Sequence, residues 1–541
     1  MKPVILSVLD NQVIVLRLAD RRLLMVFLQG QTDDQEITAR LSGDNGRTWS
    51  APTTMLKLPA GVGTFHGYHV LLDRNNELHI HLLNDAGGAF VSQGESERVL
   101  SGEMWKKRLD IWHVKSADHT RTWNTPRLIW KGYTGALNSD LLLKNGRLVV
   151  PFSYATLRSW RNRGKGLDEF TAMGYYNCTV IYSDDEGDNW HLANDLKVPV
   201  PDVVSAYGAV EPVVLELKDG RLWMLIRTQM GRFWESFSKD GAAWSSPRPT
   251  AIISSDSPAG LVRLDDGRIV LFWNNCLRFP YAYGGRHVIH AAISSDEGKT
   301  WHGCREVARD PRRNDPPPAG SDFGTAYPLP VVVNDGKVMY CTGQGAGRVL
   351  LMALDPEWLM ETVVKADFDA APDEWSVFGT KGVSFSTHPE KTTAKILRIQ
   401  KVAEDWPAVA VWNFPAGRSG RLALRFMLTP GVANVRLGLA DHFSPPFDFE
   451  DHFYNLVNIE LASDRRLLDA KLEVRRWYEL TLNWNYAERH CTLDLDGRSI
   501  GTLPLLRESS GACYLRLGSP VGAPAEGALL VESVAVEVAK A

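Results

Sequence analysis

Glu211 begins and Arg227 ends the segment EPVVLELKDGRLWMLIR, in which two apolar runs flank the turn sequence KDGR at residues 218–221. An Asp-Gly turn between two apolar runs predicts a β-hairpin, and a tight hairpin brings the outer ends of its strands together. We therefore expect the carboxylate and the guanidinium at the same end of one hairpin. Such a pair is either a structural ion pair or part of a site that binds a polar substrate.

The turn of this hairpin recurs along the chain, each time between two apolar runs. Four copies are clear and two are weaker: KNGRL at Lys144, KDGRL at Lys218, DDGRI at Asp265, NDGKV at Asn334, ADRRLL near Asp20 and RNNEL at Arg74. A repeat at this interval indicates a repeated supersecondary unit. The sequence therefore predicts six hairpins.

A second repeat, S-x-D-x-G-x-T-W, follows most of the hairpins. Its copies are SGDNGRTW at 42–49, SADHTRTW at 116–123, SDDEGDNW at 183–190, SSDEGKTW at 294–301 and the shortened SKDGAAW at 238–244. In this Asp box the Asp and Ser side chains are expected to hydrogen-bond the turn backbone, glycine relieves strain and Trp packs beneath. The box shapes a turn and performs no catalysis.

Six hairpins with interleaved Asp boxes predict an all-β fold, a six-bladed β-propeller with four strands per blade around a central channel. We place this domain at residues 1–362 and expect its sixth blade, which lacks a box, to close the ring near the N-terminal strand. Beyond Ala366 the boxes stop, and alternating runs such as RLALRFML and WYELTLNWN are joined by Gly, Pro and Asp turns. Residues 363–541 are expected to form a β-sandwich of jelly-roll or laminin-G type.

Composition narrows the classes of partner. Lys and Arg number 60 against 64 Asp and Glu, which gives a net charge of −4 and favours neither nucleic acid nor an anionic membrane as partner. No apolar run reaches the roughly 18 to 20 residues of a membrane helix, and the N-terminal segment resembles a strand rather than a signal peptide. The six cysteines are scattered singly and are expected to be buried free thiols. We expect a soluble protein whose compartment the sequence leaves open.

The repeat also predicts which residues approach the propeller axis. Residues nine or ten before each turn glycine should occupy equivalent positions on the innermost strands, which line the channel. These positions hold Asn11/Gln12, His66/Gly67, Leu137/Asn138, Glu211, Ser257/Pro258 and Tyr327. Polar side chains from several blades should therefore converge on the channel.

At these positions the chain resembles the sialidase (neuraminidase) superfamily of glycoside hydrolases, whose members share the six-bladed fold and the Asp boxes (BNR repeats). The resemblance is carried by EPVVLELKDGRLWMLIR, by AYPLPVVVNDG around Tyr327, and by GGRHVIHAAISSDEGKTW around Arg286. It implies a Tyr327 nucleophile paired with Glu211, and Arg227 with Arg286 as residues that bind a substrate carboxylate.

The mechanism implied by the resemblance is retaining hydrolysis with a tyrosine nucleophile. A phenol with an ordinary pKa near 10 is a poor nucleophile at neutral pH, so Glu211 would remove its proton. The general acid/base would be a carboxylic acid in the loop QGQTDDQEITARLSGDNG, either Asp33 or Asp34. We prefer Asp34 and assign Asp33 to substrate binding.

The chain also departs from the family pattern. Asn11 and Gln31 stand where family members carry arginines, so the usual grip of three arginines on the substrate carboxylate is reduced to Arg227 and Arg286. An amide cannot replace the bidentate contact of Arg with a carboxylate. This departure argues against strict specificity for sialic acid and makes a uronic acid, another acidic sugar or a neutral sugar a candidate for the released sugar.

His66 and Asn138 are candidates for hydrogen bonds to the substrate. His66 and His69 have no third ligand nearby, so we predict neither a metal site nor a cofactor. A basic insertion with Arg158, Arg161 and Arg163 would add positive charge if it reaches over the pocket.

We expect an exo-acting, retaining glycoside hydrolase whose substrate is an oligosaccharide, a polysaccharide or a glycoconjugate. Two alternatives belong to other classes. One is a non-catalytic carbohydrate-binding protein, which is favoured by the missing arginines at Asn11 and Gln31. The other is a propeller-type polysaccharide lyase that uses Tyr and His to abstract a proton beside a uronate carboxylate.

Overall fold

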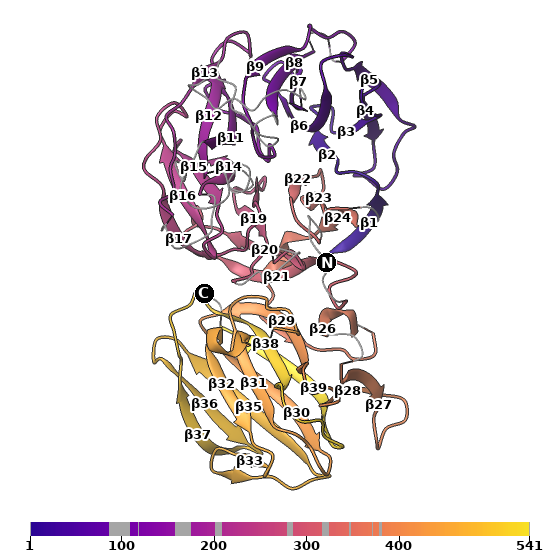
Figure 1. Ribbon diagram of the computed structural model, residues 1–541, viewed down its shortest axis with the longest axis vertical. Coiled ribbons are helices and arrows are strands. Elements are labelled where there is room, and N and C mark those ends of the chain that lie inside the picture. The colour runs from indigo at the N-terminus through magenta and orange to yellow at the C-terminus, as the bar shows by residue number, and fades with distance from the viewer. Residues whose placement is uncertain are drawn as a thin grey trace, which may run out of the picture.

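The computed structural model describes residues 2–85, 109–116, 118, 120–156, 175–200, 208–277, 285–315, 324–345, 348–370, 372–377, 381–448 and 450–539. It consists of a ring of β-sheets and a separate β-sandwich (Figure 1). The helices among the described residues are the short 3-10 turns η4 (Pro356–Met360), η5 (Pro372–Glu374) and η6 (Asp451–Tyr454), and none is long enough to cross a membrane.

The ring is the predicted six-bladed propeller, because six separate antiparallel sheets of four strands follow one another along the chain. Blade 1 is β2 (Ile14–Arg17), β3 (Leu23–Gln29), β4 (Glu36–Ser42) and β5 (Thr53–Lys57); blade 2 is β6 (Thr64–Leu72), β7 (Leu78–Asp85), β8 (Asp110–Lys115) and β9 (Arg127–Trp130). Blade 3 is β10 (Leu141–Leu142), β11 (Leu148–Thr156), β12 (Tyr175–Ser183) and β13 (His191–Leu192); blade 4 is β14 (Val210–Glu216), β15 (Leu222–Arg227), β16 (Arg232–Ser238) and β17 (Arg248–Ile253). Blade 5 is β18 (Gly260–Arg263), β19 (Ile269–Trp273), β20 (Val288–Ser294) and β21 (His302–Arg309).

Blade 6 closes the ring with both ends of the propeller sequence. It combines β22 (Leu329–Val332), β23 (Val338–Thr342) and β24 (Val349–Leu354) with the N-terminal strand β1 (Val4–Leu9), which pairs antiparallel with β24. The expected closure near the N-terminal strand is therefore confirmed. A closed ring fixes the distance of every blade from the axis.

The Asp boxes connect the third and fourth strands of their blades and have the expected internal hydrogen bonds. In the first box, Asp44 Oδ1 accepts from the Thr48 amide at 2.9 Å, and Ser42 Oγ accepts from the Gly46 amide at 2.8 Å. Hydrogen bonds from Thr48 are the largest cause that lowers the pKa of Asp44 to about 2. Trp49 packs on the apolar core shared by blades 1 and 6, so the box also joins neighbouring blades.

The C-terminal region forms two packed sheets, as predicted. One has the order β27-β28-β39-β30-β35-β36-β37, with β25 beside β39, and the other has the order β26-β29-β38-β31-β32-β33-β34. The strands are β25 (Val363–Lys365), β26 (Trp375–Val377), β27 (Val383–Thr387), β28 (Lys395–Gln400), β29 (Ala408–Gly417), β30 (Ser419–Leu428), β31 (Val435–Ala440), β32 (Val457–Leu461), β33 (Arg466–Leu467), β34 (Ala470–Lys471), β35 (Trp477–Asn485), β36 (His490–Leu495), β37 (Arg498–Pro504), β38 (Ala512–Ser519) and β39 (Ala528–Val538). One apolar core, with Trp375 and Trp412 stacked at 5.7 Å, lies between the sheets.

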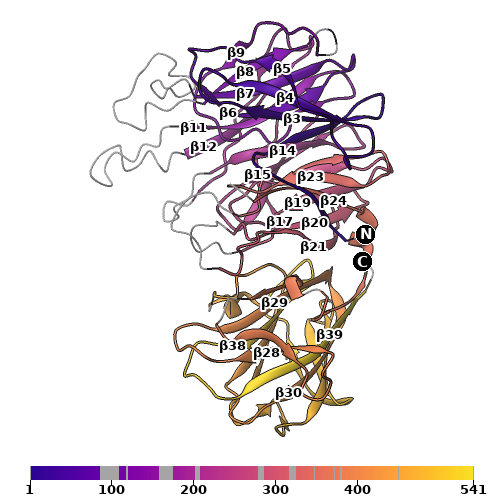
Figure 2. The same cartoon turned by 90° about the vertical axis from the view of Figure 1, so that its right-hand side faces the viewer.

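The sandwich lies against blade 5, where β21 is next to β29 (Figure 2). The Asn275 side-chain amide donates to the Asp441 carbonyl oxygen at 2.8 Å, and the Phe443 amide donates to the Asn275 carbonyl oxygen at 2.8 Å. Tyr514 of the sandwich donates to Glu306 of the propeller at 2.7 Å. All six cysteines are free; five are buried, as expected, and Cys304 at this interface is half-buried.

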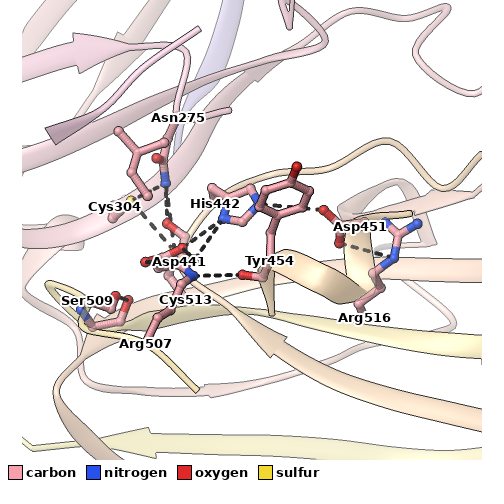
Figure 3. A network of polar contacts seen from close by, with 12 residues as sticks. Asn275, Cys304, Asp441, His442, Asp451, Tyr454, Arg507, Ser509, Cys513 and Arg516 are labelled. Carbon is pink, nitrogen blue, oxygen red and sulfur yellow. Dashed lines mark hydrogen bonds and ion pairs between the residues drawn. The ribbon is translucent and has the colours of Figure 1, made fainter. Parts of the chain in front are cut away.

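Beside these contacts His442 is buried between two carboxylates (Figure 3). Its Nδ1 lies 2.7 Å from Asp441 Oδ1, and its Nε2 lies 3.5 Å from Asp451 Oδ1. Burial alone would lower the pKa of His442, but the hydrogen bond to Asp441 and the nearby charge of Asp451 outweigh it and raise the pKa to about 9. The imidazolium therefore stabilises the segment that docks on the propeller.

We predict that this imidazolium makes stability fall in alkaline solution. Because the folded-state pKa lies above the ordinary value of 6.5, the stabilisation is fully present below pH 6.5 and is lost as the pH rises through about 9. This pKa shift contributes about 3 kcal/mol to the free energy of unfolding at low pH. Denaturant unfolding between pH 6 and pH 10 should show wild type losing this much more stability than His442→Gln. Parallel pH profiles for the two proteins would contradict the assignment.

Candidate functional site

Tyr327 and Glu211 meet on the propeller axis side of two different blades. Glu211 lies at the start of β14, and Tyr327 lies two residues before β22. The Tyr327 hydroxyl donates a hydrogen bond to Glu211 Oε1 at 3.1 Å. The repeat pattern puts both residues nine positions before a turn glycine. The structure agrees with the expectation that they occupy equivalent positions near the axis.

Both residues have a backbone conformation that is rare for non-glycine residues. The φ angle is 45° at Glu211 and 55° at Tyr327, in the left-handed region. Each is followed by a proline, Pro212 or Pro328, which cannot donate to a strand ladder. In β14 the pairing register shifts between Val210 and Val213, so the bend coincides with the proline. Such local strain persists where the surrounding structure holds it, and it is concentrated at functional sites.

Arg227 ends β15 opposite Val210, so the carboxylate and the guanidinium lie at the same end of the hairpin, as expected. Its Nη1 donates to Glu211 Oε2 and, at 3.2 Å, to the Tyr327 hydroxyl. Glu211 and Arg227 are buried, with 6% and 7% of their surface exposed. Burial would lower the pKa of Arg227, but Glu211, Asp256 and Tyr327 outweigh it and raise the pKa well above its ordinary value.

Arg286 joins the same cluster from the loop before β20. Its Nη1 donates to Gln344 Oε1 at 2.8 Å, and its Nη2 donates to the Asp256 carbonyl oxygen at 3.0 Å. The centre of its guanidinium lies 5.5 Å from the centroid of the Tyr327 ring. Two arginines therefore flank one phenol.

Asp256 is a member of the cluster that the sequence reasoning missed. Its Oδ1 accepts from Arg227 Nε at 2.7 Å, and its Oδ2 accepts from Gln229 Nε2 at 3.0 Å. The repeat count pointed to its neighbours Ser257 and Pro258, so blade 5 brings its carboxylate to the site one residue earlier than counted. A search for any acidic residue next to the counted positions would have found it.

This arrangement suits removal of a proton from the phenol. The Tyr327 hydroxyl donates to Glu211, Arg227 donates to the phenolic oxygen, and the Arg286 guanidinium lies over the ring, so negative charge on the phenol would have two cations beside it. Arg227 is paired with the carboxylates of Glu211 and Asp256, and Arg286 donates to the Asp256 carbonyl oxygen and to Gln344. A buried cluster of charges is stable only when it is paired in this way.

The first-blade carboxylates lie in an exposed loop. Asp33 Oδ1 accepts from the Gly61 amide at 2.7 Å, so this side chain holds two loops together. Asp34 is exposed, and within the described residues its carboxylate has no hydrogen-bond or ion-pair partner. Of the two, only Asp34 has a carboxylate that is not already engaged.

The remaining candidates come from blade 2 and from the segment before β10. His66 is exposed and its Nε2 lies 3.7 Å from Asp85 Oδ2, whereas His69 is buried and pairs with Asp140 at 3.3 Å. Asn138 donates to the Ala136 carbonyl oxygen at 3.2 Å, and the Ala136 amide donates to Glu211 Oε1 at 3.3 Å. Asn138 therefore braces the backbone that contacts Glu211.

Asn11 and Gln31, which stand in the place of the family arginines, are both exposed. The basic insertion with Arg158, Arg161 and Arg163 lies outside the described residues. No group of three or more His, Cys, Asp or Glu side chains arranged to hold a metal ion occurs in the part of the chain that the structure describes.

Comparison with known proteins gives a consistent result. The model of the BNR repeat-like domain family matches residues 73–340. A sialidase of Paraclostridium sordellii is 29% identical over 225 residues, which cover 39% of this chain and 49% of that protein. A sialidase of Vibrio cholerae is 27% identical over 182 residues, which cover 30% of this chain and 21% of that protein. The matched part of the chain thus spans about half, or less, of the length of these curated relatives.

Several solved structures are also similar to this chain. Trypanosoma rangeli sialidase in complex with sialic acid has a TM-score of 0.43 at 14% identity, covering 99% of this chain and 91% of that chain. A protein of unknown function from Dyadobacter fermentans has a TM-score of 0.45 at 16% identity, covering 65% of this chain and 97% of that chain. The match to the BNR repeat-like domain, the curated relatives and the six blades with their Asp boxes support a relationship of this chain to the sialidase-like superfamily of β-propeller proteins.

Proposed function

We propose that this chain is an exo-acting, retaining glycoside hydrolase of sialidase type that releases a terminal sugar from a glycan. The observation that carries the proposal is the hydrogen bond from the Tyr327 hydroxyl to Glu211, at 3.1 Å, with Arg227 bonded to both. A nucleophile within hydrogen-bond reach of a base that is itself oriented by a third group is the usual arrangement for covalent catalysis. The sialidases among the relatives support the same reaction class.

In the proposed reaction Glu211 takes the phenolic proton as Tyr327 Oη forms a bond to the anomeric carbon. The bond from that carbon to the leaving oxygen breaks, and Asp34 gives its proton to the leaving oxygen. In the second half, Asp34 removes a proton from water, the water oxygen attacks the anomeric carbon, and the phenolate leaves and takes its proton back from Glu211. Two displacements at one carbon retain the anomeric configuration.

The substrate is proposed to carry an acidic group that faces Arg227 and Arg286. Asn11 and Gln31 reduce the positive charge compared with the family pattern. The carboxylates of Glu211 and Asp256 already engage Arg227, and Arg286 donates to the Asp256 backbone carbonyl oxygen. A carboxylate substrate would therefore have to share the Arg227 guanidinium with two resident acids. This arrangement favours weaker binding of a carboxylate than a site with three free arginines, and it extends the candidates from sialic acid to uronic acids.

The proposed nucleophile and base can be tested with two conservative variants. Glu211→Gln should lower kcat by about 10²-fold to 10⁴-fold because it removes a general base, and Tyr327→Phe should lower it at least as much. Release of methylumbelliferone from sialoside, glucuronide and galactoside substrates measures the activity. Glu216→Gln, at the other end of the same strand, and Tyr182→Phe, on the outer part of blade 3, serve as folded controls.

Full activity in both Tyr327→Phe and Glu211→Gln would refute the assignment. Glycan binding without release of any sugar would instead support the non-catalytic alternative. Absorbance from an unsaturated uronate product would support the lyase alternative.

The proposed acid/base role of Asp34 predicts a dependence on the leaving group. Asp34→Asn should slow hydrolysis of unactivated alkyl glycosides by about 10²-fold to 10⁴-fold, because their leaving oxygen needs a proton. The nitrophenolate group of a nitrophenyl glycoside leaves without protonation. Hydrolysis of these substrates should therefore be much less affected in the glycosylation step. Asp33→Asn is the matched control, since Asp33 Oδ1 holds the Gly61 amide. Equal losses on both kinds of substrate, or a larger loss in Asp33→Asn, would exclude Asp34 as the acid.

A further inference from the structure

A cavity of about 460 Å³ lies between the propeller and the sandwich, away from the Tyr327 cluster. From the propeller it is lined by Arg232, Trp273 and Trp301, and from the sandwich by Arg418, Arg507 and Ser510. This volume is within the range of pockets that hold small ligands, roughly 300 to 1,000 Å³. None of the residues that line it belongs to the cluster around Tyr327 and Glu211.

One wall of the cavity is held in place by the interface contacts (Figure 3). Arg507 binds both oxygens of Asp441 and donates from Nε to the Tyr454 carbonyl oxygen at 2.9 Å. The Asn275 amide holds the Asp441 backbone from the propeller side at 2.8 Å. The wall is therefore preformed, so a ligand that enters has little ordering cost to overcome.

The charges that line the cavity do not balance. The Asp441 carboxylate is neutralised by Arg507, and the Glu508 carboxylate pairs with Arg489 at 2.7 Å. Arg232 and Arg418, in contrast, donate to carbonyl oxygens, of Thr250 at 3.1 Å and of Ser509 at 2.7 Å. Within the described ranges neither has a carboxylate at ion-pair distance. Two guanidinium charges are thus left for an anion, and a guanidinium binds carboxylate and sulfate groups with directional hydrogen bonds.

The aromatic lining indicates what kind of molecule carries the anion. Trp273 and Trp301 both border the cavity, and Trp273 Nε1 donates to the Ile253 carbonyl oxygen at 2.8 Å. Trp301 Nε1 is buried and has no hydrogen-bond partner within the described part of the chain. Indole rings offer apolar contact area together with a polar N–H, which suits a sugar ring with an apolar C–H face and hydroxyl groups.

We propose that this cavity is a second carbohydrate-binding site that takes an anionic saccharide. Arg232 and Arg418 bind its carboxylate or sulfate group, and its ring packs against Trp301. Arg232 belongs to the propeller and Arg418 to the sandwich, so the bound saccharide bridges the two domains. The site is independent of the proposed hydrolysis, because it shares no residue with the catalytic cluster.

The proposal is tested by titration calorimetry on the full chain with the Tyr327→Phe substitution, which prevents turnover. The probes are trigalacturonate and 3′-sialyllactose as carboxylates, a heparin-derived disaccharide as a sulfated sugar, and lactose as the neutral control. We expect at least one anionic probe to bind, lactose to bind at least about tenfold more weakly, and binding to weaken with added salt. The anion is identified by whether a carboxylate probe or the sulfated probe binds more tightly.

Variants of the lining decide where the probe binds. Arg232→Ala and Arg418→Ala should each weaken that binding event at least about tenfold, and Ser510→Trp should abolish it by filling the cavity without changing its charge. Arg221→Ala on the same blade and Arg466→Ala on the sandwich remove exposed arginines that already pair with Asp219 and Asp464, and they should leave binding unchanged. Thermal unfolding checks that each variant is folded. Binding that is unchanged in all three lining variants, or no binding of any anionic probe, overturns the proposal.

Discussion

Burial of the Arg227 guanidinium is the constraint on which the site depends. A charge with 7% of its residue surface exposed is stable only if anions and hydrogen-bond acceptors surround it. Glu211 from its own blade, Asp256 from blade 5 and Tyr327 from blade 6 meet this requirement together. The same contacts that stabilise the arginine bring a phenol and a carboxylate to 3.1 Å. The contacts that neutralise Arg227 therefore also fix the geometry of the candidate nucleophile.

The propeller makes this meeting of three blades possible. Its ring is closed by β1 on β24, and each Asp box ties the third strand of a blade to the fourth while its Trp packs towards a neighbour. The sandwich adds a second layer of constraint at blade 5, through Asn275, Asp441 and the buried His442. Because Asp256 and Arg286 also belong to blade 5, the docked domain stabilises the blade that orients Arg227.

The sequence predicted the blades, the ring closure and the relative position of Glu211 and Tyr327, because hairpin turns and Asp boxes are local patterns whose spacing fixes the register. It did not predict Asp256, since blade 5 departs from the common count by one residue. It could not show that Asp33 is engaged by Gly61, or that Arg232 and Arg418 share a cavity, because these contacts join segments far apart in the chain. Local periodicity therefore determines the fold, whereas side-chain partners depend on long-range packing.

We propose that Tyr327 bonds covalently to the sugar during hydrolysis. The most direct test is mass spectrometry of the protein after incubation with a fluorinated analogue of the sugar it releases, which slows breakdown of a glycosyl-enzyme. Our account predicts one glycosyl adduct on the peptide that contains Tyr327, and no adduct in Tyr327→Phe. An adduct on an aspartate or a glutamate, or hydrolysis with inversion and no adduct, would contradict it.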